Sequence, residues 1–136
     1  MYLIDANIFL EVELGQKKGF DSKKLLKRFE KGELTGYITD FHVDSIVIVM
    51  ENYGKKGEEI AIFLSSLLKY RGLSIIVASL DTKICAAEIM EKHHLDFDDA
   101  LVCQCMIENG LSKLVSYDAH FDNIDFVERL TPDKLI

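Results

Sequence analysis

Three carboxylates gather within four positions in the segment Asp96-Phe97-Asp98-Asp99, which leads into a long apolar run. One interpretation is helix capping, because an acid at a helix N-terminus accepts hydrogen bonds from free N–H groups and complements the helix dipole. The other interpretation is a cation site, since clustered carboxylates are hard oxygen ligands that suit Mg²⁺ or Mn²⁺. The cation site requires that other acids of the chain lie at the same place.

Three further acids stand beside apolar segments. Asp5 ends the apolar run at the N-terminus, Asp118 follows another apolar run, and Asp44 is embedded in the stretch 41–50, which is otherwise nearly all apolar. Burying an unpaired acid there costs several kcal/mol or more. A bound metal would offset both the burial and the mutual repulsion of the carboxylates. The alternative for Asp44 is that it points outward on the polar stripe of its helix.

The elements that must position these acids alternate between strand and helix. Predicted strands cover residues 1–4, 34–39, 73–78, 113–117 and 126–130, and predicted helices cover residues 7–14, 21–31, 41–53, 58–70, 81–93 and 97–109. The strands are continuous apolar runs, which is typical of a parallel sheet covered on both faces. We therefore expect an α/β fold, a three-layer α/β/α sandwich with a four- or five-stranded mainly parallel sheet. The length of 136 residues indicates a single domain over residues 1–136.

In such a sheet the four acids converge. Asp5 and Asp118 directly follow strands, whereas Asp44 and Asp99 lie near the first turn of helices. Ligands of open α/β sheets bind at the carboxyl ends of the strands, and the helices that follow parallel strands begin at that same edge. We expect Asp5, Asp44, Asp99 and Asp118 to meet at one end of the molecule.

The composition limits the class of partner. The net charge is −7, so a nucleic-acid partner would not be held by a basic face alone, and a divalent cation would have to neutralise phosphate. Three cysteines without a Cys-x-x-Cys motif suggest neither a disulfide framework nor a zinc knuckle, which fits a reducing cytoplasm. No apolar stretch reaches the ~20 residues that span a bilayer, so we expect no membrane partner.

Four short motifs stand in order along the chain: residues 2–10 with Asp5, residues 37–44 with Asp44, Asp99-Ala100-Leu101, and residues 115–121 with Asp118. In this order and spacing they resemble the PIN-domain nucleases, and within that family the small prokaryotic VapC-type toxins. The resemblance covers nearly the whole chain. One position departs from the family pattern, because the family usually has a glutamate where this chain has Asp44. Aspartate is shorter by one methylene, so its reach to a metal is shorter.

The resemblance implies an endoribonuclease that depends on Mg²⁺ or Mn²⁺ and cleaves single-stranded or structured RNA with a metal-activated water. It assigns one or two ions to four acids, Asp5, Asp44, Asp99 and Asp118. Asn7 and Ser116 would support these ligands through hydrogen bonds. Asp96 and Asp98 are interpreted as a helix cap and a surface acid. The four histidines share no ligand spacing, although His120 could touch a phosphate.

The same resemblance implies the toxin of a toxin–antitoxin pair, with an antitoxin protein and a second copy of the chain, in a homodimer, as partners. A competing hypothesis is a catalytically weak PIN-like module that binds RNA or protein. Phosphoryl-transfer proteins fit less well. A receiver-type domain needs a paired acid after the first strand, an aspartate after the third and a lysine after the last. In this chain Asp5 stands alone after the first strand, and no lysine fits at the end of the last. A haloacid-dehalogenase-type phosphatase needs Asp-x-Asp, and Asn7 occupies its second position.

Overall fold

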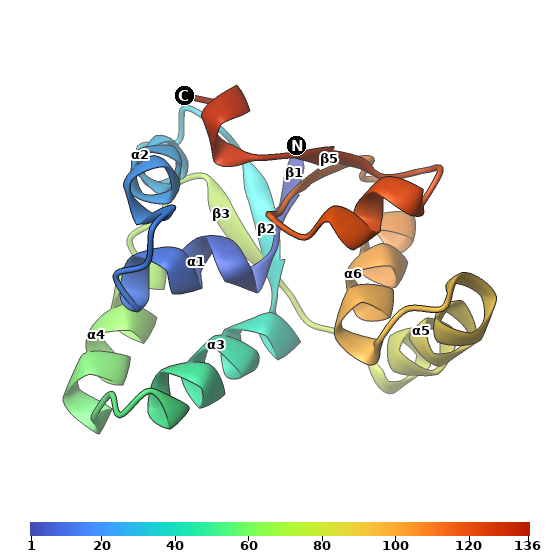
Figure 1. The fold of residues 1–136 in the computed structure, drawn as a ribbon, viewed down its shortest axis with the longest axis horizontal. Coiled ribbons are helices and arrows are strands. Elements are labelled where there is room, and N and C mark those ends of the chain that lie inside the picture. The colour runs from blue at the N-terminus through green and yellow to red at the C-terminus, as the bar shows by residue number, and fades with distance from the viewer.

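The computed structural model describes all residues from 1 to 136 and has alternating strands and helices (Figure 1). The strands are β1 (Tyr2–Ile4), β2 (Gly36–Thr39), β3 (Leu73–Ile76), β4 (Lys113–Val115) and β5 (Glu128–Leu130). The helices are α1 (Ala6–Glu13), α2 (Gly19–Glu30), α3 (Asp40–Asn52), α4 (Gly57–Leu67), α5 (Leu80–His93) and α6 (Phe97–Glu108). Two short 3-10 helices, η1 (Ala119–Asn123) and η2 (Pro132–Lys134), flank β5. The predicted element order is confirmed.

The five strands form one parallel sheet in the order β3-β2-β1-β4-β5. From the central β1 the chain builds outward to β2 and β3 on one side, then crosses over to β4 and β5 on the other. The boundary between β1 and β4 is therefore the point where the strand order reverses. In open α/β sheets this is where a crevice forms beyond the carboxyl ends of the strands.

Helices cover both faces of the sheet, and the strand residues alternate between the two layers. Ile4 and Val115 pack with α1, α2, α3 and α4 on one face, whereas Leu3 and Leu114 pack with α5 and α6 on the other. Figure 1 shows α1 to α4 on one side of the strands and α5 with α6 on the opposite side. The predicted three-layer α/β/α sandwich is confirmed.

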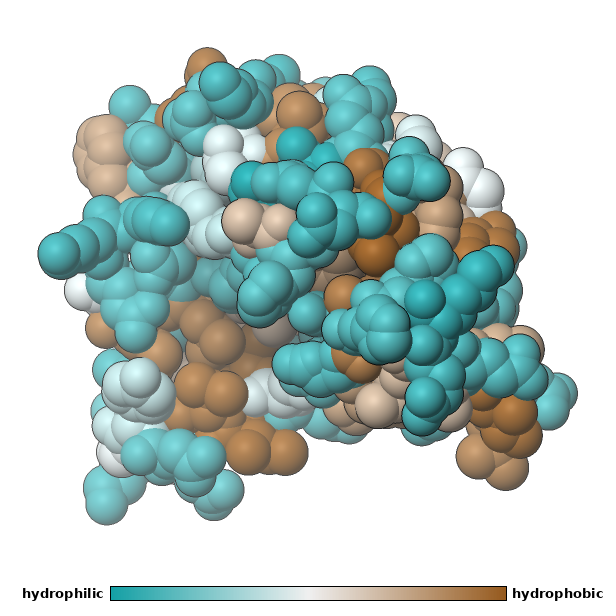
Figure 2. Space-filling model, turned by 45° about the vertical axis from the view of Figure 1, so that its right-hand side comes forward, coloured by the Kyte–Doolittle hydropathy of each residue, from teal (hydrophilic) through white to brown (hydrophobic).

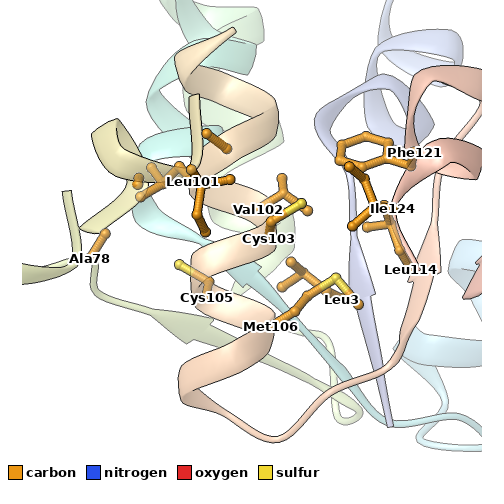
Figure 3. Close-up of a cluster of buried hydrophobic side chains, with 13 residues drawn as sticks. Leu3, Ala78, Leu101, Val102, Cys103, Cys105, Met106, Leu114, Phe121 and Ile124 are labelled. Carbon is orange, nitrogen blue, oxygen red and sulfur yellow. The ribbon is translucent and has the colours of Figure 1, made fainter. Parts of the chain in front are cut away.

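The core on the α6 side fixes the position of that helix. In Figure 3, Leu3 and Leu114 from the sheet face Met106 and Cys103 of α6, and Phe121 of η1 closes the same cluster. Cys103 and Cys105 are free thiols with almost no exposure, so they act as small apolar core groups. Because this core holds both α6 and η1 against the central strands, the N-terminal end of α6 lies next to the ends of β1 and β4.

The edge strand β3 differs from the prediction of a strand buried on both faces. Ile75 is 50% exposed and the following Val77 is 75% exposed. β3 pairs only with β2, so it forms an edge of the sheet; Leu73 and Ile76 pack against the two cores, but Ser74 and Ile75 stay exposed. The strand also ends at Ile76, because the backbone N–H of Ala78 donates to the Asp40 carboxylate of α3 at 2.9 Å.

None of the helices combines the length and apolar character that a membrane crossing requires.

Candidate active site

Asp5 is placed by the tight connection between β1 and α1. It is the N-cap residue of α1, and its Oδ1 accepts a hydrogen bond from the backbone N–H of Ala6 at 2.8 Å. The side chain is buried, with 8% exposure. Burial raises the pKa of the Asp5 carboxyl, and its hydrogen bond from Ser116 opposes that rise. The end of β1 thus places the buried Asp5 carboxylate where the strand order of the sheet reverses.

A buried hydrogen-bond network ties the ends of β1 and β4 together. The Ser116 hydroxyl donates to Asp5 Oδ2 at 2.6 Å and accepts from the Asp118 backbone N–H at 3.0 Å. Asn7 Nδ2 lies 3.3 Å from Asp5 Oδ2 and 3.2 Å from Ser116 Oγ, and Asn7 Oδ1 accepts from the Tyr117 backbone N–H at 3.3 Å. The structure therefore brings both predicted supporting residues to Asp5.

Asp118 follows β4 in the same way that Asp5 follows β1. It is the N-cap of η1, and its Oδ1 accepts from the His120 backbone N–H at 2.9 Å. The His120 ring lies beside the same carboxylate, with Nδ1 3.0 Å from Asp118 Oδ1. His120 is mostly exposed, so its imidazole stands at the outer rim of the site.

Asp99 reaches the site from the first turn of α6. Burial and the neighbouring carboxylates, Asp118 first and then Asp5, raise the pKa of Asp99 to about 7. Asp96 is the N-cap residue of this helix, but its side chain makes no capping hydrogen bond. Asp98 is exposed in the same turn. Since neither acid is engaged in a cap, both add negative charge to the site.

These side chains surround one open cleft of about 300 Å³. Its lining residues come from both sides of the sheet: Asp5, Ala6, Asn7, Leu10, His42, Ser45, Val49, Asp96, Asp98, Asp99, Asp118 and His120. Five of them are acids and two are histidines. A second cleft of similar size adjoins it and shares Asp96, Asp99 and His120. The cleft lies where the strand order reverses, as the sheet topology requires.

Asp44 does not lie in this cleft. The residue is exposed on α3, whereas the helix turns His42, Ser45 and Val49 toward the acids. Positions 42, 45 and 49 share one face of a helix, and position 44 is about 200° around the axis from position 42. The structure therefore supports the alternative that Asp44 points outward, and it brings together Asp5, Asp99 and Asp118 without the fourth predicted ligand.

The donor set fits a divalent cation. Ligand atoms of Asp99, Asp118 and His120 all lie within 4.8 Å of one another, a separation that one ion can bridge. Asp5 stands in the same cleft but outside this close set, and each of its oxygens already accepts a hydrogen bond from the protein. Carboxylate oxygens are the ligands that Mg²⁺ and Mn²⁺ prefer, and a cation would relieve the repulsion that raises the pKa of Asp99.

Two residues of the cleft, His42 and His120, were not assigned to the metal from the sequence. His120 comes two residues after Asp118, so a turn brings it back to the carboxylate it follows. His42 comes three residues after Thr39, which caps α3, so it lies in the first turn at the edge where the acids meet. Both residues could have been predicted from the sequence, because each lies within three residues of a strand end or a helix cap at the edge where the acids meet.

The sequence of the chain matches known proteins over most of its length. The family model for the PIN domain matches residues 2–127. Ribonuclease VapC2 of Methanocaldococcus jannaschii is 27% identical over 135 residues, which covers 91% of this chain and 89% of that protein.

Solved structures share the fold at lower sequence identity. The Sarcin-Ricin loop cleaving toxin VapC20 of Mycobacterium tuberculosis has a TM-score of 0.76 at 15% identity, covering 94% of this chain and 98% of that chain. A chain of VapBC2 from Rickettsia felis, solved on a DNA fragment from its promoter, has a TM-score of 0.70 at 19% identity and covers 96% and 97%. A chain of a toxin–antitoxin complex from Klebsiella pneumoniae has a TM-score of 0.71 at 16% identity and covers 97% and 98%. With the family match over residues 2–127, the resemblance seen in the four sequence motifs is confirmed, and the chain belongs to the PIN-domain family.

Proposed function

We propose that this chain, acting as one PIN-like unit over residues 1–136, is an endoribonuclease that depends on Mg²⁺ or Mn²⁺. The observation that carries the proposal is the convergence of Asp5, Asp99 and Asp118 in one cleft where the strand order reverses. These acids come from three separate segments of the chain. Their mutual repulsion is unfavourable for folding, so a bound cation gives the arrangement a physical reason.

Asp99 and Asp118 are the residues that would hold the cation, and His120 stands within reach of the same point. When bound, a divalent cation supplies the positive charge that activates water and stabilises charge on a phosphodiester. Asp5 contributes negative charge in the same cleft. Ser116 and Asn7 fix the direction of the Asp5 carboxylate, so this group needs no rearrangement when the ion and the substrate arrive.

The RNA backbone needs cationic contacts that the acidic cleft does not offer. Lys18 lies beside the site, with Nζ 4.6 Å from the centre of the Tyr117 ring, and it shares a neighbouring groove with Asn7. The ring stacks against the ammonium group and holds it near the cleft. We propose that Lys18 contacts a substrate phosphate and so positions the RNA over the acids.

RNA cleavage with purified protein tests the proposed activity. Single-stranded and hairpin RNA should be cut in Mn²⁺ or Mg²⁺, and EDTA should stop the reaction. Asp99→Asn and Asp118→Asn should each lose at least ~100-fold in rate, since a lost metal contact removes about 3 kcal/mol or more of stabilisation. Asp81→Asn is the matched control, because Asp81 is an exposed acid in the first turn of α5, away from the cleft. Cleavage that survives EDTA and both site variants would contradict the proposal.

A catalytically weak RNA- or protein-binding module is the second candidate. The observation that favours it is the position of Asp44, which leaves the site with one acid fewer than the family pattern implies. The same assay separates the two functions. A binding module would retain RNA in a filter or mobility-shift measurement without cutting it in either metal.

We also propose that the chain is the toxin of a toxin–antitoxin pair in the cytoplasm, where an RNA substrate would be met. The supporting observation is its structural similarity to a chain of the toxin–antitoxin complex from Klebsiella pneumoniae and to the toxin VapC20. Expression of this chain alone should arrest growth, and co-expression of a short neighbouring open reading frame should restore it. Unimpaired growth at high expression of an active nuclease would argue for an RNA-processing role instead.

A further inference from the structure

His42 is a buried imidazole on the wall of the acidic cleft. It lies in the first turn of α3 with only 3% exposure, and it lines the cleft together with Asp5 and Asp99. Its place is fixed by Thr39, whose Oγ1 accepts from the His42 backbone N–H at 3.0 Å and also contacts the ring nitrogen Nδ1. The orientation of the ring is therefore set from one side by the helix cap.

The other ring nitrogen, Nε2, has no hydrogen-bond partner although it is fully buried. It is the only buried side-chain polar atom in the structure in this condition. An unsatisfied buried polar atom typically costs ~1–3 kcal/mol, and native proteins rarely keep one without a use. The Asp5 and Asp98 carboxylates are the charges that act most strongly on this ring, and the backbone of Asp98 also lies beside it. The unpartnered nitrogen therefore belongs to the same acidic surroundings as the proposed metal ligands.

Burial holds the pKa of His42 below its ordinary value, against the opposing effect of Asp5 and Asp98. A neutral imidazole is the form that binds metal ions. If Nδ1–H donates to Thr39 Oγ1, the lone pair of the buried Nε2 is left without a hydrogen bond inside the protein. A hydrogen bond that fixes one ring nitrogen while the other binds metal is the usual arrangement for ligating histidines.

We propose that His42 Nε2 is a nitrogen ligand of the cation held in this cleft. This inference rests on the proposed function, because it concerns the ion on which that function depends. In this assignment the contribution of α3 to the metal is the imidazole of His42 rather than the carboxylate of Asp44. Mg²⁺ seeks oxygen ligands and accepts nitrogen poorly, whereas first-row transition ions accept imidazole readily. The site should therefore prefer Mn²⁺ over Mg²⁺ more strongly than a site with carboxylate ligands alone.

Pulsed electron paramagnetic resonance of the Mn²⁺-loaded protein tests the bond itself without any turnover. Protein with ¹⁵N-labelled histidine should show nitrogen hyperfine coupling to Mn²⁺. Because His120 could also supply nitrogen, the decisive comparison is made in the His120→Gln variant. The coupling should persist in His120→Gln and disappear in the double variant His42→Gln/His120→Gln. Absence of coupling in His120→Gln, with Mn²⁺ bound, would overturn the proposal.

Metal selectivity gives a second and independent readout. Calorimetric titrations of Mg²⁺ and Mn²⁺ yield a ratio of dissociation constants for each variant. His42→Glu replaces the nitrogen by an oxygen donor, so the preference for Mn²⁺ should fall ~10-fold or more. Ser65→Glu is the matched control, because it adds the same carboxylate at an exposed position of α4 that lines neither cleft. It should leave the ratio unchanged, and an unchanged ratio in His42→Glu as well would count against the inference.

The two levels of proposal fail in different ways. If the wild type binds no Mn²⁺, or binds it equally well after Asp99→Asn, then the metal centre itself is refuted and His42 with it. If Asp99 is required for binding but neither the coupling nor the selectivity depends on His42, only the further inference is refuted. Circular dichroism of each variant shows whether it is folded, and the measurement in His120→Gln does not require any change at position 42.

Discussion

Asp99 is an acid of the cleft whose pKa is raised by burial and by the neighbouring carboxylates. Its carboxyl has a pKa of about 7, because it is partly buried and faces Asp118 and Asp5. In an unfolded chain the same group has a pKa near ~3.9. The folded metal-free protein therefore holds a proton on Asp99 that the unfolded chain releases between about pH 4 and pH 7.

This difference predicts the pH dependence of stability without metal. A raised folded-state pKa stabilises the protein at pH values below about 4, and that contribution is lost as the pH rises through about 7. In EDTA, Asp99→Asn should therefore gain stability over the wild type as the pH is raised from 5 to 8. After allowance for solvent screening we expect about 1 kcal/mol, or ~3 °C in melting temperature. Thermal melts at both pH values measure it, and parallel profiles of the two proteins would contradict the shift.

Ser116 is predicted to be essential for orientation rather than chemistry. Its hydroxyl is fully buried between Asp5, Asn7 and the Asp118 backbone. Ser116→Ala should destabilise the fold by ~1–3 kcal/mol, because three polar groups lose a partner. It should also lower metal affinity ~10-fold or more, since Asp5 would no longer be held in place.

Urea denaturation and Mn²⁺ titration measure the two effects of Ser116→Ala. Ser65→Ala is the control, because Ser65 is exposed on α4 far from the cleft. It should leave metal affinity unchanged. A Ser116→Ala protein that binds Mn²⁺ as tightly as the wild type would show that Asp5 keeps its direction without the hydroxyl.

At the scale of elements, two acids of the site lie at the N-termini of helices that begin directly after strands. Asp5 caps α1 directly after β1, and Asp118 caps η1 directly after β4. Each acid thus accepts a backbone N–H with one oxygen while standing at the cleft. Helix capping and cation binding, the two interpretations of acids at such positions, are therefore compatible in one side chain.

Gly72, directly before β3, packs closely against the neighbouring backbone, so a larger residue there should lower the stability of the fold. A Cβ atom added to Gly72 would clash with the carbonyl oxygen of Leu34 and would lie 2.8 Å from that of Phe29. The backbone of Gly72 also accepts from the Gly36 N–H at 2.7 Å, so it has little room to move. Gly72→Ala should destabilise the protein by ~1–3 kcal/mol through overpacking.

Gly57→Ala is the matched control for Gly72→Ala. A Cβ atom there meets nothing within 4 Å, and Gly57 begins helix α4. The alanine should be neutral or stabilise by up to ~1 kcal/mol. Chemical denaturation of both variants checks the pair, and equal stabilities would mean that the loop at Gly72 shifts freely.

The whole molecule is acidic, with a net charge of −7, and it leaves apolar side chains at its surface. Figure 2 shows hydrophobic side chains in several separate groups among hydrophilic ones. Around α4, the most exposed large apolar side chains are Ile62, at 71%, and Leu68, at 88%. Apolar surface of this kind is a common feature of protein–protein contacts.

We expect the protein to form a homodimer, because association would cover part of this surface. Sedimentation velocity over a range of concentrations up to the high micromolar should show a dimer that persists on dilution to a few micromolar. Raising the salt concentration should not dissociate it, since an apolar contact is not screened by ions. A strictly monomeric profile at the highest concentration would contradict the prediction.

The sequence by itself determined the element order and the ends at which Asp5 and Asp118 stand. Continuous apolar runs identified the parallel strands, and glycines identified the ends of most helices, so observed boundaries differ from predicted ones by no more than three residues. An acid that directly follows a strand is carried to the sheet edge by chain connectivity alone. That local constraint is why the position of these two acids could be derived without coordinates.

Only the tertiary structure decided which side of α3 faces the acids. Apolar residues stand on nearly all sides of this helix, so its hydrophobic pattern does not select a face. Packing of Ile46 and Met50 into the core turned His42 toward the cleft and left Asp44 in solvent. The order of the strands in the sheet was likewise known only from the tertiary structure. The fourth position of the site was therefore set by core packing, because packing, not local sequence, fixes the rotation of a helix about its axis.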